Sequence, residues 1–223
     1  MATSGTYSWS PELVEIYDEA FERCGVPLET LDGRHLRAAR RSMEFMLSAM
    51  ANIGILLWAV DQQTQLLTEA VPTYNTPVGT IAILDMVLRR DGLDVNVFPM
   101  QRDEYLAIPS KTQEGLPSRY YFDRQETTPT ITLWSNPILS TDQIIYYRLR
   151  RLQDAGDATN TLDVPYRWQE TMCAGLAARL ALKFAPDKYQ LLKGDYEQHL
   201  RMALQEDRQR SPTMIRPKFG MRR

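Results

Sequence analysis

Residues 36–67, LRAARRSMEFMLSAMANIGILLWAVDQQTQLL, contain the change of pattern that decides the fold. In the first part of this stretch, apolar residues recur every three or four positions as far as Leu57, which is the period of an amphipathic helix. Counted from a start near Asp32, the pattern predicts a helix of about 26 residues, roughly 39 Å long. From about Asp61 the period changes to two, which indicates β-strands. A long helix therefore leads into a region of strands.

Six strands are expected in residues 61–152, because short alternating runs are separated there by turn residues such as Asp91-Gly92. The expected strands cover residues 63–70, 81–90, 94–98, 119–123, 130–134 and 143–151. A short helix is expected over residues 101–107. Together these elements indicate a small antiparallel sandwich or barrel-like module. The polar residues 153–163 that follow are expected to form a linker or exposed loop.

Helices are expected on both sides of this region. The first begins at Ser10, an N-cap residue followed by proline, and ends before Gly25. Two further helices are expected after Pro165, separated near Pro186, and the second of them covers residues 188–209. The fold class is therefore α+β: a helical bundle of about four helices with an antiparallel β-rich insertion and an extended C-terminal arm.

The arm, residues 210–223, is expected to be extended because Pro212 and Pro217 cannot continue a helix. From Arg201 to the end of the chain there are seven basic and two acidic residues, whereas residues 1–200 carry 19 basic and 26 acidic ones. An acidic body with a basic tail indicates a tail that docks on an acidic partner or on nucleic acid. The alternative is a solvated, disordered terminus.

The composition is that of a soluble globular chain. With 223 residues, 43% hydrophobic and 24% charged, it excludes the disordered, collagen-like and membrane classes. The net charge of -2 gives the chain as a whole no reason to coat nucleic acid. Residues 1–9 have neither a basic start nor an apolar core, so no signal peptide is expected. The longest apolar stretch, residues 53–60, is too short to span a bilayer. We therefore expect a protein that is made in a reducing cytosol.

No arrangement of residues typical of catalysis or of cofactor binding is found in the sequence. The two histidines, His35 and His199, lack a partner at metal-ligand spacing and are expected at the surface. The two cysteines, Cys24 and Cys173, lie among apolar residues and are expected to be buried, reduced thiols. Walker, dinucleotide-binding and nucleophile-elbow motifs are all missing. We therefore expect no cofactor, no metal and no enzymatic activity.

Two patterns that imitate functional sites have simpler explanations. Four glutamates follow one another at three- or four-residue spacing opposite the apolar stripe of the first helix: Glu12, Glu15, Glu19 and Glu22. A solvated helix face explains them better than a glycosidase or metal pair. The aromatic and basic residues of 119–122 and 146–148 alternate with the strand period. Half of them are therefore expected in the core rather than stacked on bases.

Four stretches carry a family resemblance through their order and spacing. They are AFERCGV (20–26) with LRAARRS (36–42) and NIGILLW (52–58); EYLAIPSKT (104–112) with PSRYYFDR (117–124); PTITLW (129–134); and DVPYRWQE (163–170) with GLA (175–177). With these stretches, between about residues 10 and 200, the chain resembles the head-to-tail adaptor proteins of short-tailed bacteriophages. These are also called tail accessory factors or packaged-DNA stabilisation (head completion) proteins.

The resemblance implies a structural protein of the virion, located at the head–tail interface and assembled in the host cytoplasm. Family members form a ring, typically of twelve copies, beneath the portal protein ring. By this resemblance, residues 1–60 and 164–209 form the ring and contact the portal, and residues 61–152 face distal tail components such as tail nozzle or tail-fibre proteins. The arm 210–223 docks along the portal, and genomic DNA passes through the channel without specific binding.

The portal-binding residues expected on this basis are the basic residues of the C-terminal segment and the apolar residues between them. They are Arg201, Arg208, Arg210, Met214, Ile215, Arg216, Lys218, Phe219, Arg222 and Arg223. Two other functions stay open at this point. One is a DNA-binding module that uses the basic tail, and the other is a glycan hydrolase with paired carboxylates.

Overall fold

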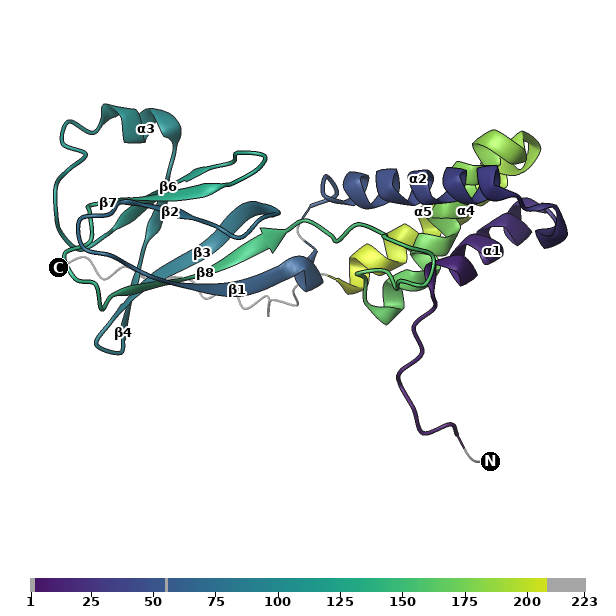
Figure 1. Cartoon of the computed structure of the whole chain (residues 1–223), viewed down its shortest axis with the longest axis horizontal. Coiled ribbons are helices and arrows are strands. Elements are labelled where there is room, and N and C mark those ends of the chain that lie inside the picture. The colour runs from purple at the N-terminus through teal and green to yellow at the C-terminus, as the bar shows by residue number, and fades with distance from the viewer. Residues whose placement is uncertain (1–2, 55, 208–223) are drawn as a thin grey trace, which may run out of the picture.

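Two parts, one helical and one of β-strands, lie end to end in the computed structural model, which describes residues 3–54 and 56–207 (Figure 1). The helical part contains four long helices: α1 (Leu13–Cys24), α2 (Gly33–Met50), α4 (Gln169–Phe184) and α5 (Tyr189–Glu206). Short 3-10 helices precede three of them or follow α2: η1 (Leu28–Thr30), η2 (Leu57–Ala59), η3 (Tyr166–Trp168) and η4 (Pro186–Lys188). The predicted α+β fold class is confirmed. Among the described residues, no helix has the length and apolar character needed to cross a membrane.

Helix α4 is the centre of the helical part, because α1, α2 and α5 all contact it. Its residues Leu176 and Leu180 are fully buried, and Trp168 at its start is fully buried too. Gly175 permits the closest approach: a Cβ atom there would lie 2.6 Å from Met46 Sδ of α2 and 2.8 Å from the Tyr196 ring of α5. The missing side chain at this position therefore lets two helices pack against α4 at one level.

Helix α1 begins later than its sequence predicts, with Glu12 rather than Ser10 as the N-cap residue. The side chains of Glu12 and Glu15 form a capping box with the backbone. The loop 153–163 also contributes, because its carbonyl groups accept hydrogen bonds from the first N–H groups of α1, for example Asn160 O from Leu13 N at 2.9 Å. The segment is a loop with mostly exposed residues, as predicted, but it also caps a helix, and Ala155 and Leu162 within it are buried.

Helix α2 is shorter than predicted, with 18 residues instead of about 26. Its capping residue is Asp32, as expected, but the chain turns after Met50, where Asn52 N and Ile53 N bond carbonyls only three residues back. Gly54 then has a φ of +129°, which residues with a side chain rarely adopt. The apolar pattern continues past the end of α2 because Leu56, beyond Gly54, is also buried in the helical core. Its backbone is extended rather than helical.

The β part holds two sheets of four strands, in the orders β1-β8-β3-β4 and β2-β7-β6-β5. The strands are β1 (Val60–Leu66), β2 (Thr73–Asn75), β3 (Thr80–Arg90), β4 (Leu93–Asn96), β5 (Phe98–Met100), β6 (Arg119–Asp123), β7 (Thr130–Trp134) and β8 (Gln143–Arg150). The two sheets enclose a separate core that includes Leu88, Tyr120, Ile131, Leu133 and Ile144. The short helix α3 (Arg102–Ala107), predicted over residues 101–107, is confirmed.

The strand predictions need three corrections. The strand expected over residues 94–98 divides at Val97, whose side chain is buried, into β4 and β5. β5 pairs with β6 in parallel, so the module is not wholly antiparallel. β2 was not predicted, since only three residues form it, too few for an alternating pattern to stand out.

The two parts meet where β1 and β8 leave the helices. Leu149 in β8 and Leu152, two residues after its end, belong to the helical core. The buried carboxylate of Asp207, directly after α5, accepts a hydrogen bond from Leu57 N at 3.1 Å and pairs with Arg167 at 2.8 Å. Asp207 thereby joins the end of α5 to the segment that connects α2 with β1.

Candidate functional site

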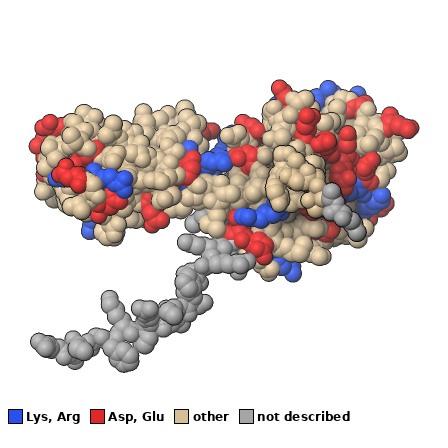
Figure 2. Space-filling view, turned by 90° about the horizontal axis from the view of Figure 1, so that it is seen from below, with Lys and Arg blue, Asp and Glu red and all other residues tan. Residues whose placement is uncertain are grey.

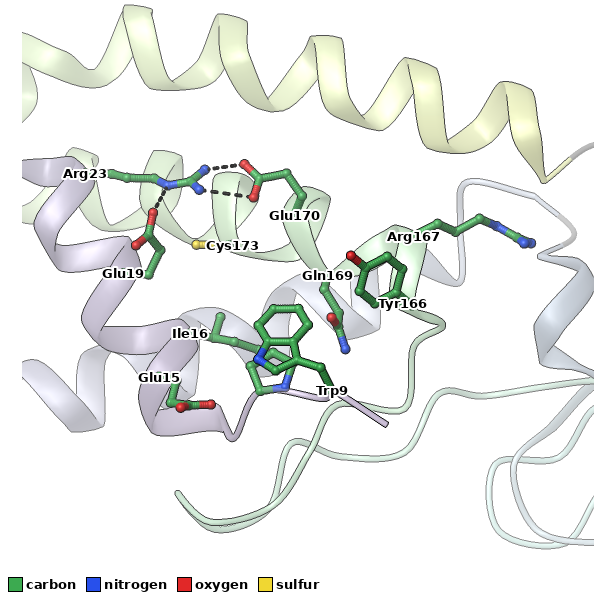
Figure 3. Close-up of a pocket in the computed structure, with 11 residues that line it drawn as sticks. Trp9, Glu15, Ile16, Glu19, Arg23, Tyr166, Arg167, Gln169, Glu170 and Cys173 are labelled. Atoms are coloured by element: carbon green, nitrogen blue, oxygen red, sulfur yellow. Dashed lines mark hydrogen bonds and ion pairs between the residues drawn. The ribbon is translucent and has the colours of Figure 1, made fainter. Parts of the chain in front are cut away.

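A groove of about 610 Å³ lies between α1 and the start of α4, at the side of the helical part (Figure 3). Aromatic side chains line one end of it, where the Trp9 and Tyr166 rings meet edge to face with centroids 6.0 Å apart. Charged side chains line the other end: Glu19, Arg23 and Glu170; Glu15 lies on α1 nearer Trp9, and Arg167 lies next to Tyr166 (Figure 3). The groove thus combines exposed aromatic surface with a set of carboxylates.

Arg23 organises the charged end of this groove. Its guanidinium donates to both carboxylate oxygens of Glu170, at 2.8 and 3.2 Å, and to Glu19 at 2.8 Å (Figure 3). The hydrogen bond from Arg23 lowers the pKa of Glu170, and the same bond raises the pKa of Arg23. Asp195 of α5 lies 3.9 Å from the guanidinium and 3.4 Å from His199. Arg23 of α1 thereby connects α1 to α4 through Glu170 and lies beside Asp195 of α5.

The two thiols are placed as predicted. Cys24 and Cys173 are free and buried, which confirms the expectation from their apolar neighbours. Burial raises the pKa of Cys173 to about 12 and also raises that of Cys24. Since the thiolate is the nucleophilic form, neither cysteine is activated for covalent chemistry at neutral pH.

The histidines differ from one another. His35, expected at the surface, is half-buried: its ring lies against Phe21 and Phe184, with centroids 5.7 and 4.8 Å away. Its Nδ1 lies 2.8 Å from the N-cap Asp32, so it helps to close the start of α2. His199 stands near the carboxylates of Asp195 and Glu170. Among the described residues, no group of three or more histidines, cysteines and carboxylates is arranged to hold a metal ion.

The four glutamates of the first helix are all exposed, as their spacing predicts. They do not form one cluster, however. Glu12 and Glu15 act in the capping box, and Glu19 pairs with Arg23. The capping box and the ion pair with Arg23 therefore explain the positions of three of the four side chains.

Of the residues expected to bind a portal, the structure describes only Arg201. It is exposed on α5, next to the exposed side chain of Met202. Helix α5 buries only Leu192 and Ala203, while Leu191 on its outer face is 75% exposed. The other expected residues lie outside the described residues: Arg208, Arg210, Met214, Ile215, Arg216, Lys218, Phe219, Arg222 and Arg223.

Sequence reasoning missed two features. One is the buried carboxylate of Asp207, for which no local pattern gives a signal. The other is a set of exposed arginines on α2: Arg34, Arg37, Arg40 and Arg41. Their spacing of three, three and one places them on one side of a helix, and this signal could have been found in the sequence.

Comparison with known proteins gives no match from which a function could be assigned. No family model matches this chain, and no curated protein matches it either. The geometry on which a function can rest is therefore the groove beside α1, the outer face of α5, the arginines of α2 and the far end of the β part.

Proposed function

We propose that the protein is a structural connector: a head-to-tail adaptor of a short-tailed bacteriophage that forms a ring of about twelve copies on the portal. The observation that carries the proposal is the end-to-end arrangement of two parts with separate cores (Figure 1). A chain built in this way offers surfaces to two different partners at its two ends. Such an adaptor seals the packaged DNA and provides both the genome channel and the platform for the tail.

The helical end supplies the surface for the portal in this proposal. Helix α5 contacts α4 by one face only and leaves Leu191, Arg201 and Met202 exposed on its outer side. The chain continues from α5 directly into the basic segment 208–223. An exposed helix that leads into arginines and apolar residues provides the anchors that a protein interface needs, since arginine pairs with carboxylates and apolar side chains fill pockets.

The opposite end supplies the surface for distal tail components. Large apolar side chains are exposed there on β4, β5 and α3, at the end of the β part away from the helices (Figure 1). They are Leu93, Phe98 and Leu106. Exposed apolar groups favour a protein contact, because burying them releases water.

The test is to mix the full-length protein with its portal ring, measure the mass of the complex and image it end-on. One copy per portal subunit, in a ring, is the expected result. The variant with Arg216, Lys218, Arg222 and Arg223 replaced by alanine should dock more weakly with unchanged thermal stability. A matched control, Leu93→Ser with Phe98→Ser at the other end of the molecule, should dock like the original chain.

Absence of any complex, or full docking by the quadruple alanine variant, would count against the adaptor function. Tight, salt-sensitive binding of duplex DNA by the isolated protein would instead favour the DNA-binding alternative.

A further inference from the structure

One side of α2 carries four exposed arginines, Arg34, Arg37, Arg40 and Arg41, which we call the arginine face. They border a surface hollow of about 660 Å³ together with Phe45, whose side chain is 63% exposed, and Glu44, whose carboxylate accepts a hydrogen bond from Ala155 N at 3.1 Å. In the part of the chain that the structure describes, none of the four makes an ion pair.

The surroundings add positive charge to the arginine face. Burial lowers the pKa of Lys183 on α4, and the nearby Arg41 and Arg179 lower it further. The one carboxylate at the start of α2, that of the N-cap Asp32, accepts hydrogen bonds from Arg34 N and His35 N and does not pair with the side chain of any described arginine. The proximity of Lys183 to Arg41 and Arg179 is unfavourable for an isolated chain. An external group with negative charge would remove this cost.

The same chain presents negative charge on another helix. Asp18 and Glu22 lie on the side of α1 away from its buried stripe, one helical turn apart and next to Glu15, and we call these three residues the acidic face. Asp18 and Glu22 form no ion pair with any described residue. Figure 2 views the helical part from the side opposite α2 and shows Asp and Glu gathered there.

The two faces cannot neutralise each other within one chain. Each helix turns its buried residues toward α4, for example Ala39 and Met43 of α2 and Ala20 of α1, so the charged sides point outward in different directions. A two-fold dimer could pair arginine face with acidic face only if both faces of one copy pointed at the same partner, and the two faces point in different directions. A head-to-tail arrangement brings an arginine face onto an acidic face at every contact, and such an interface closes into a ring when the rotation between neighbours divides a full turn.

We propose that the arginine face of one copy binds the acidic face of the next copy, and that Phe45 lies within this contact. The inference rests on the proposed ring function and names the surface through which neighbouring subunits meet. Arginine suits the role because its planar guanidinium forms paired hydrogen bonds with a carboxylate. The contact should weaken with salt, since the four arginines, Glu15 and Glu22 are exposed and Asp18 is only half-buried.

Charge reversal of full-length protein tests the inference without the portal. Sedimentation at low salt and high protein concentration should show association of the original chain that salt abolishes. Arg37→Glu with Arg41→Glu should weaken it by roughly tenfold or more, and so should Asp18→Lys with Glu22→Lys. Mixing the two double variants should restore association, because each supplies the charge that the other has lost. A matched control, Arg119→Glu with Arg124→Glu on the β part, should associate normally.

Two results would overturn the inference. One is a monomer across the whole concentration series at low salt; the other is association that neither reversal changes. If Arg37→Glu with Arg41→Glu abolishes duplex DNA binding while association is unchanged, the arginine face belongs to nucleic acid and the inference is also wrong. Docking on the portal ring is measured separately with the variant that lacks the basic side chains at 216, 218, 222 and 223, so failure of the proposed function and failure of this inference are distinguishable.

Discussion

Replacing Gly175 by alanine should destabilise the helical part, although alanine is the better helix former. The added Cβ would lie 2.6 Å from Met46 Sδ and 2.8 Å from Tyr196 Cε2, closer than packed carbon atoms come. Overpacking of this kind costs about 1–3 kcal/mol. Alanine returns about 1 kcal/mol through its helix propensity, so the net loss for Gly175→Ala is about 0–2 kcal/mol.

Gly194→Ala on α5 is the matched control for this experiment. It makes the same chemical change in a helix, but a Cβ there meets no described atom within 4 Å. The control should therefore gain about 1 kcal/mol, and the two variants should differ by about 1–3 kcal/mol. Urea unfolding of both variants, with equal slopes, measures the difference. In thermal unfolding it corresponds to about 2–4 °C per kcal/mol for a chain of this size. If Gly175→Ala proves as stable as Gly194→Ala, the close approach of α2 and α5 at Gly175 is refuted.

Two further predictions concern buried side chains. Trp168→Ala should lower the free energy of unfolding by about 3–5 kcal/mol, measured in urea, because the ring is fully buried against Trp58. Trp168→Phe should cost less, since the indole N–H has no hydrogen-bond partner among the described residues that phenylalanine would lose. A loss under about 1 kcal/mol for the alanine variant would show that Trp168 is outside the core. The Cys173 thiol, with its pKa raised to about 12, should stabilise the fold fully below pH 8.5 or so and lose that contribution as the pH rises toward 12, because the unfolded thiol ionises first. Stability of the Cys173→Ser variant, measured from neutral to alkaline pH, should decline less steeply than that of the original chain, and parallel declines would contradict the assignment.

Elements with a long, unbroken pattern could be predicted from the sequence. The stripe from Trp168 to Phe184 became α4, and the alternating residues of Thr130–Trp134 became β7, because one face of each element is buried against a core. The end of α2 could not be predicted in the same way. Leu56 continues the apolar period, yet it reaches the core through a turn at Gly54. An apolar period in the sequence indicates which residues are buried, but a helix and a turn can bury the same positions, so the period alone does not show where the helix ends.

Surfaces were harder to predict than elements. The spacing of Arg34, Arg37 and Arg41 was visible, but their lack of counter-ions depends on which side of α2 packs on α4. The role of Asp207 depends on a contact with Leu57, 150 positions away in the chain. The parallel pairing of β5 with β6 likewise depends on tertiary arrangement, since strand direction leaves no trace in a three-residue segment.

The β part begins and ends at one place, because Val60 in β1 pairs with Leu149 in β8. Helices α2 and α4 belong to one core but are separated along the chain by this whole insertion. If the insertion were unfolded, packing α2 against α4 would cost the entropy lost on closing a long loop. A folded β part avoids this cost, because it already holds its two ends side by side. We therefore expect the insertion to fold first and the helical core to complete afterwards. The same adjacency makes the insertion exchangeable: a different module whose ends meet could occupy the position of β1–β8 and leave the helices as they are.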